Sequence, residues 1–376
     1  MNGIYYYLIA FVVIWVLVAV FHERLSTHGV ELNFPVIMWK TQRLRGLISR
    51  INKLSPRFWR WYMNVGIIVA FGAMIFITYT IVSTLPSVFE APSVSIVIPG
   101  VDIPGSQIYI PFVYGLIGLA TVLVVHEFSH GVQAVGEKIP IKSIGLLLFA
   151  ILPGAFVEPD EDKLKEAKKT SRLRVYAAGS IANLSLAVIA LLLVSLFSGG
   201  IPQFFEEDGI AIDRIVPDSP SDGVLKEGMV LQAIDNHKIN DSESYVDIIS
   251  SYSPGDNVTV KTDQGTYNVV LDKNPNNESR GFFGIQANKH FDLINDSLGP
   301  LPWILFELIE LFQWVAMLNL GIGLFNLLPI KPLDGGHMLE ILLSYKLSEE
   351  HYKPLVNALS VVLAMVIVFS IVAGFL

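Results

Sequence analysis

Residues 121–135 read TVLVVHEFSHGVQAV and place His126, Glu127 and His130 at the end of a strongly apolar run. The uncharged residues that precede them, from 112 onward, complete a segment long enough to cross a bilayer as a helix. An ionisable side chain in hydrocarbon costs roughly 2.5–3.5 kcal/mol or more unless something compensates for it. Three such side chains so close together therefore indicate a functional site at membrane depth.

The composition is that of a membrane protein. Of the 376 residues, 52% are hydrophobic and 16% are charged, whereas soluble domains usually carry about 25% charged residues. The formal net charge is −8, and most of the acidic residues lie in one polar block at 205–298. The rest of the chain has no basic face of the kind that binds nucleic acid. Because the chain contains no cysteine, any metal must be held by histidine and carboxylate.

The hydropathy pattern predicts a polytopic α-helical membrane protein with about six spans. The predicted spans are 4–21, 62–85, 112–135, 175–197, 302–328 and 354–376.

The distribution of basic residues predicts how the chain crosses the membrane. The loop after the first span and the stretch 161–174 are rich in Lys and Arg, whereas 86–111 has neither. Basic short loops stay in the cytoplasm. Both chain ends and the acidic block are therefore expected outside, and the histidines within the bilayer towards the cytoplasmic side, because His126 lies roughly 20 Å along its helix from the outer end.

Two apolar stretches are poor spans. Residues 92–111 alternate apolar and small residues between Pro-Gly turns, and 143–159 is short and interrupted by Pro153-Gly154. Both have a strand-like pattern. Irregular backbone at membrane depth must be buried in protein or line a wet cavity, so these stretches are read either as re-entrant segments beside the histidines or as interfacial loops.

His126 and His130 are four residues apart and therefore share one helix face. Imidazoles at this spacing can both reach a zinc ion, and Glu127 is placed to take a proton from water bound to it, as in the H-E-x-x-H pattern of metallopeptidases.

A catalytic zinc site needs a third protein ligand. The segment 317–342 offers Asp334, which follows Pro329 and Pro332 and precedes two glycines. His337 and Glu340 are competing candidates. Asp334 could also serve only to cap the helix that follows it.

HEFSH in one span together with NLLPIKPLDGG at 326–336 resembles the site-2 protease family of intramembrane zinc metalloproteases. The resemblance implies that His126, His130 and Asp334 hold one Zn²⁺, that Glu127 is the general base, and that Asn326 helps to hold an extended substrate. GAFVEPDE at 154–161 is similar to the family's Gly-rich segment. AAGSIANL at 177–184 is similar to its Gly-Pro-x-x-Asn segment, with Ser180 in place of proline.

The acidic block resembles a PDZ domain inserted between spans, an α+β fold outside the membrane. Its pattern predicts a strand, a short helix, a strand and a helix, then a hairpin around Asp263-Gln264-Gly265. Such domains bind extended peptides along an open strand edge, and Gly209–Ile212 is the expected groove strand.

Four regions follow from this reading. Residues 1–111 hold the N-terminal spans, the basic loop and a strand-like outer segment. Residues 112–200 hold the catalytic core, 205–288 the PDZ-like domain, and 300–376 the second half of the membrane core.

The expected function is intramembrane zinc endopeptidase, cutting transmembrane segments of other proteins that another protease has already trimmed. The expected partners are those substrates and the lipid bilayer, without nucleic acid. The alternative is a non-catalytic membrane adaptor that binds peptides through the PDZ-like domain. A third reading, a metallopeptidase of another clan with a glutamate ligand, would need Glu158 or Glu161, which lie in a Pro-flanked stretch.

Overall fold

The computed structural model describes residues 4–42, 44–89, 94–104, 106, 108–150, 152–275 and 277–375. The chain divides into two compact units, here called the helical unit (Met1–Ser195 with Leu308–Leu376) and the inserted unit (Leu196–Glu307). Each unit is described by itself.

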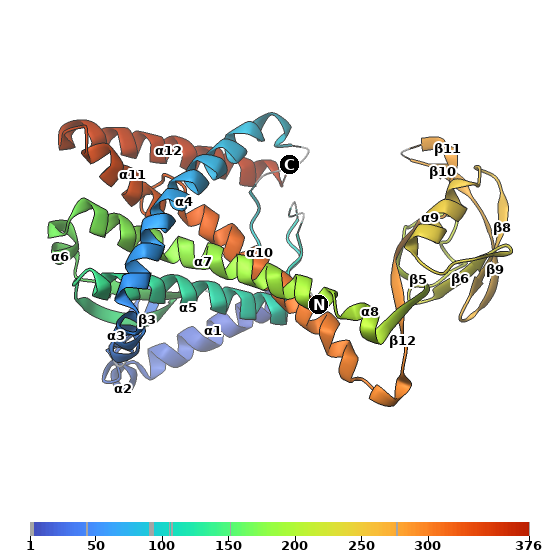
Figure 1. The fold of residues 1–376 in the computed structure, drawn as a ribbon, viewed down its shortest axis with the longest axis horizontal. Coiled ribbons are helices and arrows are strands. Elements are labelled where there is room, and N and C mark those ends of the chain that lie inside the picture. Colours follow the sequence, from blue (N-terminus) through green and yellow to red (C-terminus); the bar gives the residue numbers. More distant parts are fainter. Residues whose placement is uncertain are drawn as a thin grey trace. The chain divides into compact units, whose positions relative to one another are not determined.

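The helical unit is built mainly of long apolar helices (Figure 1). Its helices, two of which continue past the unit boundary, are α1 (Ile4–Val20), α2 (His22–Ser26), α3 (Arg45–Leu54), α4 (Pro56–Ser83), α5 (Phe112–Gly136), α6 (Glu161–Glu166), α7 (Lys169–Ser198), α10 (Ile304–Asn326), α11 (Asp334–Ser344) and α12 (Glu349–Ala373).

Five helical segments of the described chain are long and apolar enough to cross a membrane: Pro56–Ser87, Phe112–Gly136, Lys169–Phe204, Leu301–Asn326 and Glu349–Ala373. They coincide with five of the predicted spans. The sixth prediction falls on α1, an apolar helix of 17 residues, which is shorter than these segments, so a sixth span stays a prediction.

The outward faces of these helices are apolar. Ile68 is 74% exposed, Leu192 is 65% exposed and Val368 is 59% exposed. Apolar side chains this open to the surroundings on successive turns are disfavoured in water and favoured in lipid. The helical unit is therefore an integral membrane structure.

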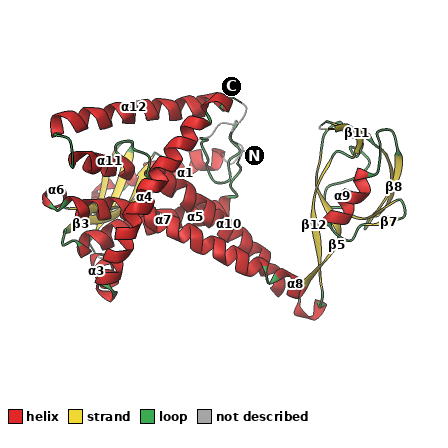
Figure 2. Cartoon of the chain, turned by 45° about the horizontal axis from the view of Figure 1, so that its top comes forward, coloured by secondary structure: helices red, strands yellow, loops and turns green. Residues whose placement is uncertain are grey.

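A four-stranded antiparallel sheet lies beside the C-terminal half of α5 (Figures 1 and 2). Its order is β1 (Val30–Asn33), β2 (Val36–Thr41), β3 (Ile141–Phe149) and β4 (Leu152–Pro159). A buried cluster from Ile48, Val132 and Ile144 holds α3, α5 and the sheet together.

The strand-like reading of 143–159 is thus confirmed. The reading of 92–111 as a strand is wrong for the described residues 94–104, 106 and 108–111, which contain only an isolated bridge between Ile98 and Val101. The chain turns at Gly100, with a φ of +73°, and the Gly100 N–H donates to the Ile110 carbonyl at 2.7 Å, so the segment closes into a loop instead of extending.

The inserted unit is a small α+β fold. Its elements are α8 (Ile201–Phe204), β5 (Phe205–Ile215), β6 (Val230–Ile234), β7 (His237–Lys238), α9 (Ser242–Ser250), β8 (Asn257–Thr262), β9 (Gly265–Val270), β10 (Asp272–Asn274), β11 (Asn277–Phe282) and β12 (Ile285–Leu293). The main sheet has the order β12-β5-β6-β8-β9, and β10 pairs with β11. Ile212, Leu231 and Ile234 lie at the centre of its core.

Two expectations for this unit are settled by the backbone. The hairpin is confirmed, with Thr262 paired to Gly265. The short helix between the first two strands is wrong: the described residues there form turns. Asp218, Gly223 and Gly228 have φ values of 59°, 74° and 85°, and a right-handed helix requires negative φ at every residue.

The proposed groove strand is also wrong. Ile210 pairs with Leu231 of β6 on one side and with Lys289 of β12 on the other. A strand that is paired along both edges offers no edge to a peptide. The edge strands of this sheet are β12 and β9.

Candidate metal centre

His126 and His130 lie one turn apart on α5, as their spacing predicts. Their Nε2 atoms are 3.1 Å apart, and their ring centroids are 4.7 Å apart. Both side chains are largely buried, with 11% and 12% of their surface exposed.

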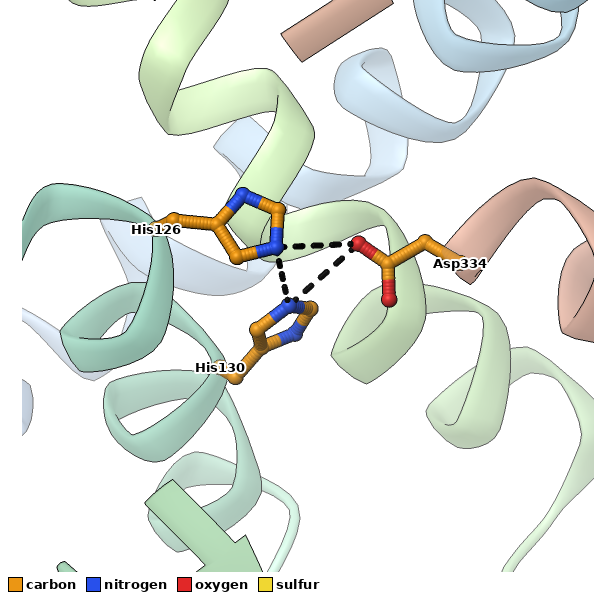
Figure 3. A group of neighbouring side chains, drawn as sticks. All are labelled: His126, His130 and Asp334. Carbon is orange, nitrogen blue, oxygen red and sulfur yellow. Dashed lines mark hydrogen bonds and ion pairs between the residues drawn. The ribbon is translucent and has the colours of Figure 1, made fainter. Parts of the chain in front are cut away.

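Asp334 reaches the same point from the other half of the chain (Figure 3). Its Oδ2 lies 3.4 Å from the His126 Nε2 and 3.3 Å from the His130 Nε2. Asp334 is the first residue of α11. Gly336 lies two residues further along the helix, and a Cβ there would come within 2.6 Å of the Ile330 carbonyl. The glycines of the DGG sequence therefore let the first turn of α11 pack closely against the backbone of residues 327–331, which follow α10.

The spacing of these three atoms fits a metal ion. In tetrahedral coordination with zinc–ligand bonds of about 2.0–2.1 Å, ligand atoms lie about 3.3–3.4 Å apart. The observed separations are 3.1, 3.3 and 3.4 Å. His126, His130 and Asp334 can thus hold one divalent ion and leave a fourth position open.

The two competing ligands are engaged elsewhere. The His337 ring stacks on Tyr176 with a centroid distance of 4.7 Å and an angle of 11°. The Glu340 carboxylate is paired with the Lys331 ammonium at 2.5 Å. Burial lowers the pKa of His337, and the neighbouring charge of Lys331 adds to this effect.

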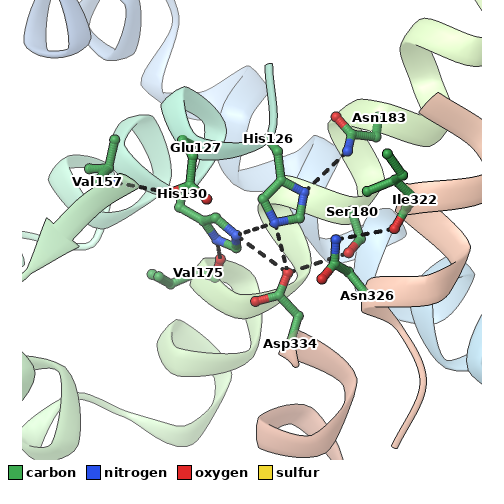
Figure 4. Close-up of polar contacts among 10 residues, drawn as sticks. All are labelled: His126, Glu127, His130, Val157, Val175, Ser180, Asn183, Ile322, Asn326 and Asp334. Carbon is green, nitrogen blue, oxygen red and sulfur yellow. Dashed lines mark hydrogen bonds and ion pairs between the residues drawn. The ribbon is translucent and has the colours of Figure 1, made fainter. Parts of the chain in front are cut away.

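Hydrogen bonds to the far side of each imidazole orient the Nε2 atoms (Figure 4). His130 Nδ1 lies 2.7 Å from the Val175 carbonyl, to which it can only donate. That tautomer leaves the Nε2 lone pair facing Asp334. Second-sphere partners of this kind are the usual support of histidine ligands.

Asn183 plays the corresponding part for His126. Its side-chain amide lies 3.2 Å from the His126 Nδ1, and it is fully buried. No group in the described ranges forms a hydrogen bond with the Asn183 Oδ1. If His126 presents its Nε2 lone pair to a metal, its Nδ1 carries the proton, and a half-turn of the amide brings this orphaned oxygen round to accept it. The buried oxygen is thus satisfied only when His126 has the tautomer of a metal ligand.

Glu127 lies beside the ligand group but outside it. One carboxylate oxygen, Oε2, accepts the Val157 N–H of β4 at 2.9 Å. Glu127 also lines a cavity of about 800 Å³ that contains His126, His130, Asp334 and Asn326. Further charged groups from α6, α11 and α12 line this cavity, so water can reach the site although the helices around it are apolar.

A second cavity, of about 770 Å³, meets the first at Glu127 and runs along the sheet. Its walls include Val124 and Phe128 of α5, Trp39 of β2 and Phe156 of β4. Glu127 therefore stands between a polar cavity and a largely apolar one.

Gly179 of α7 packs directly against both histidine rings, which leaves no room for a side chain at this position. A Cβ at this position would lie 2.7 Å from the His126 ring and even closer to the His130 Nε2. We predict that Gly179→Ala reduces zinc affinity at least about tenfold, because the methyl group would displace both rings from the ligand geometry. The matched control is Gly321→Ala on α10, where nothing lies within 4 Å of the added atom. Equal zinc titrations for the two purified variants would contradict this prediction.

The sequence alone indicated the three candidate ligands and Glu127, but not most of the groups that form hydrogen bonds with them. Val175 and Val157 act through their backbones, and no side-chain pattern marks such a role. Ser180, whose hydroxyl donates to the Asp334 Oδ2 at 3.4 Å, and Asn183 lie in the segment similar to a family motif.

Comparisons with known proteins agree with this geometry. A family model described as "Peptidase family M50" matches residues 114–367. "Uncharacterized protein MJ0971" of Methanocaldococcus jannaschii is 30% identical over 234 residues, which are 61% of this chain and 57% of that protein. "Membrane-bound transcription factor site-2 protease homolog" of Arabidopsis thaliana is 27% identical over 138 residues, 36% of this chain and 26% of that protein. "Regulator of sigma-W protease RasP" of Bacillus subtilis is 26% identical over 214 residues, 45% and 49% of the two chains.

The chain thus spans between about a quarter and just over half of the length of these curated relatives. Among solved structures, the PDZ domain of the SdrC-like protein Lmo2051 from Listeria monocytogenes matches 24% of this chain and 90% of its own, with 23% identity and a TM-score of 0.20. The family match covers both the paired histidines and Asp334. As the two sequence motifs predicted, the chain belongs to the site-2 proteases, peptidase family M50.

Proposed function

We propose that this protein is an intramembrane zinc endopeptidase that cuts transmembrane segments of other proteins. One observation carries the proposal: two imidazoles from α5 and a carboxylate from α11 converge within 3.4 Å, with Glu127 beside them in a cavity lined by charged groups. In this proposal His126, His130 and Asp334 hold one Zn²⁺.

Bound zinc would supply Lewis acidity, polarising a carbonyl and lowering the pKa of water to about 7. Glu127 takes the proton from the attacking water through its carboxylate and passes it to the leaving amide nitrogen. The C–O bond thus forms as the C–N bond breaks. The Val157 N–H holds one Glu127 oxygen in place, so the other is directed to the proton transfer.

The substrate is proposed to lie extended along β4. Among the described strands, β4 pairs with β3 alone, and its Val157 N–H donates to Glu127 instead of to another strand. A transmembrane helix must be unwound before it is cut, because its carbonyls are otherwise engaged in the helix, and a free strand edge provides replacement bonds. Asn326 lines the same cavity and is proposed to bind the substrate backbone.

The protein is proposed to cross the cell membrane several times, with its active site within the bilayer towards the cytoplasmic side. The cavity wall supports it: Glu161, Lys165 and Arg172 come from the basic stretch 161–174, which the charge bias assigns to the cytoplasm.

The experiment that tests this function uses the purified full chain in proteoliposomes with a reporter transmembrane substrate. We expect cleavage within the hydrophobic segment, loss of cleavage on chelation and recovery on adding zinc. The alternative, a membrane adaptor, predicts an intact reporter under every condition.

The inserted unit is proposed to lie outside the membrane as a PDZ-like size filter that admits only substrates already trimmed by another protease. Its peptide-binding edge would be β12, which in the described part of the sheet pairs with β5 alone and lies at one end of the strand order. Ile285 and Ala287 of β12 pack on the same core as Ile248 and Ile249 of α9, which leaves a strand and a helix to form the groove.

We predict that replacing residues 205–293 by a short Gly-Ser linker raises cleavage of a full-length substrate relative to a trimmed one. The reason is that a bulky ectodomain would no longer be held away from the site. The measurement is the ratio of the two cleavage rates, and an unchanged ratio with both rates intact would remove the filter from the proposal.

A further inference from the structure

Arg172 is an unpaired cation in the wall of the catalytic cavity. The other basic side chains that line it are engaged: Lys331 with Glu340, Lys165 with Glu161, and Lys353 with Glu349. Among the residues that the structure describes, Arg172 forms no ion pair, and its Nε is buried without a hydrogen-bond partner.

Arg172 lines the same cavity as His126, His130 and Asp334. It lies on α7 three residues before Val175, whose carbonyl accepts the His130 Nδ1–H. Tyr176, one turn further along α7, stacks on His337 and forms the neighbouring wall.

The helix itself gives no reason for a cation here. Arg172 lies in the first turn of α7, which contains no acidic residue, and the N-terminus of a helix disfavours positive charge. Leaving a guanidinium N–H buried and unpaired costs further free energy. A bound anion would compensate for both effects.

We propose that Arg172 is a carboxylate-binding subsite for the peptide in the cavity, an inference that rests on the proposed peptidase function. A guanidinium binds a carboxylate through two parallel hydrogen bonds. Two peptide groups carry this chemistry: the α-carboxylate that cleavage creates, and an Asp or Glu side chain near the scissile bond.

The test measures binding to the metal-free full chain in detergent micelles, so it needs no cleavage. Three fluorescent nonapeptides share one apolar sequence: the first ends in a free carboxylate, the second in an amide, and the third in an amide with one internal Glu. We expect the first or the third to bind at least about tenfold more tightly than the second, the difference expected of a charge-assisted pair. A tighter first peptide identifies the product terminus, and a tighter third peptide identifies a substrate side chain.

Arg172→Gln should abolish this preference while leaving the affinity of the neutral amide peptide unchanged. Lys165→Gln, which removes a cavity charge that is already paired, should leave the preference intact. Equal binding of all three peptides to the unmodified chain, or an unchanged preference in Arg172→Gln, would overturn the proposal.

If Arg172→Gln does not fold, Arg172→Lys tests the proposal instead. Lysine keeps the positive charge but lacks the planar guanidinium that forms two parallel hydrogen bonds. A preference reduced several-fold supports the proposal, and a full preference opposes it. The binding test does not depend on catalysis. If the unmodified protein does not cleave the reporter but still binds the carboxylate peptides through Arg172, the peptidase proposal is rejected and the binding site is not.

Discussion

Glu127→Gln is expected to lower the cleavage rate of a reporter transmembrane substrate by about 10²–10⁴-fold, the usual contribution of a general base. Glutamine has nearly the same shape and can still accept the Val157 N–H through its oxygen, but it cannot take a proton. Glu127 is not one of the three residues that converge at the candidate centre. The Glu127→Gln variant should therefore bind as much zinc as the unmodified protein, one ion per chain. The measurement is the single-turnover rate together with metal analysis of the same preparation.

Two other glutamates serve as controls for the loss of charge. Glu158 of β4 accepts the Ser143 hydroxyl at 2.5 Å, and Glu161 of α6 pairs with Lys165 at 3.2 Å. Their glutamine variants should cleave at rates close to that of the unmodified protein. Full activity of Glu127→Gln would end the peptidase proposal, whereas loss of activity in Glu158→Gln or Glu161→Gln would revive the reading with a glutamate ligand.

Asp334→Asn is expected to weaken zinc binding by at least about a hundredfold and to abolish cleavage. Even a residue that only supports a ligand is worth about 10–100-fold in metal affinity, and Asp334 supplies the only carboxylate oxygen in the group. The neutral amide is isosteric, so a loss of affinity would report the missing charge and not a missing contact. Competition against a zinc chelator of known affinity measures the change.

Glu340→Gln is the matched control for Asp334→Asn. It removes a carboxylate from the same cavity and the same helix, but that carboxylate is paired with Lys331. Zinc affinity should remain within a few-fold of the unmodified value. If Asp334→Asn binds zinc normally while Glu340→Gln does not, the third ligand has been assigned to the wrong residue.

Burial explains why these effects should be large. Polar groups at membrane depth are tolerated when they are paired with one another or face water. Here the imidazoles and the carboxylate are mutual neighbours. The outer nitrogens of the two rings contact Val175 and Asn183, the Ser180 hydroxyl donates to the Asp334 Oδ2, and charged groups line the cavity. Removing one member would leave the others with unpaired polar atoms in an apolar surrounding.

Long elements were predictable because their signal is local. A run of about 20 apolar residues has few alternatives to a membrane helix, which is why five predicted spans reappear as helices. The strand-like character of 143–159 was predictable for a similar reason, but its division into two paired strands, β3 and β4, was not predicted. By contrast, β1 and β2 were missed: they are 4 and 6 residues long, lie in a stretch read as a basic loop, and depend on pairing between Val36 and Phe149.

The two errors in the inserted unit have different causes. The expected short helix is prevented by positive φ values at Asp218, Gly223 and Gly228, which composition does not reveal. The expected groove strand, β5, has no free edge on this side because it pairs with β12, a segment about 75 residues further along the chain. Which strand lies at an edge depends on the whole sheet.

From the residues alone, the class of the protein, the five apolar segments that form long helices and the residues suited to hold a metal could be predicted. They could be predicted because helix periodicity, apolar length and ligand chemistry act over a few neighbouring residues. The folded structure was needed to show that Asp334, and not His337 or Glu340, reaches the paired histidines. It also shows that a side chain at Gly179 would collide with both rings, and that the Arg172 Nε has no hydrogen-bond partner among the described residues. Each of these depends on distances between helices that are far apart in the chain, and such distances are set by packing.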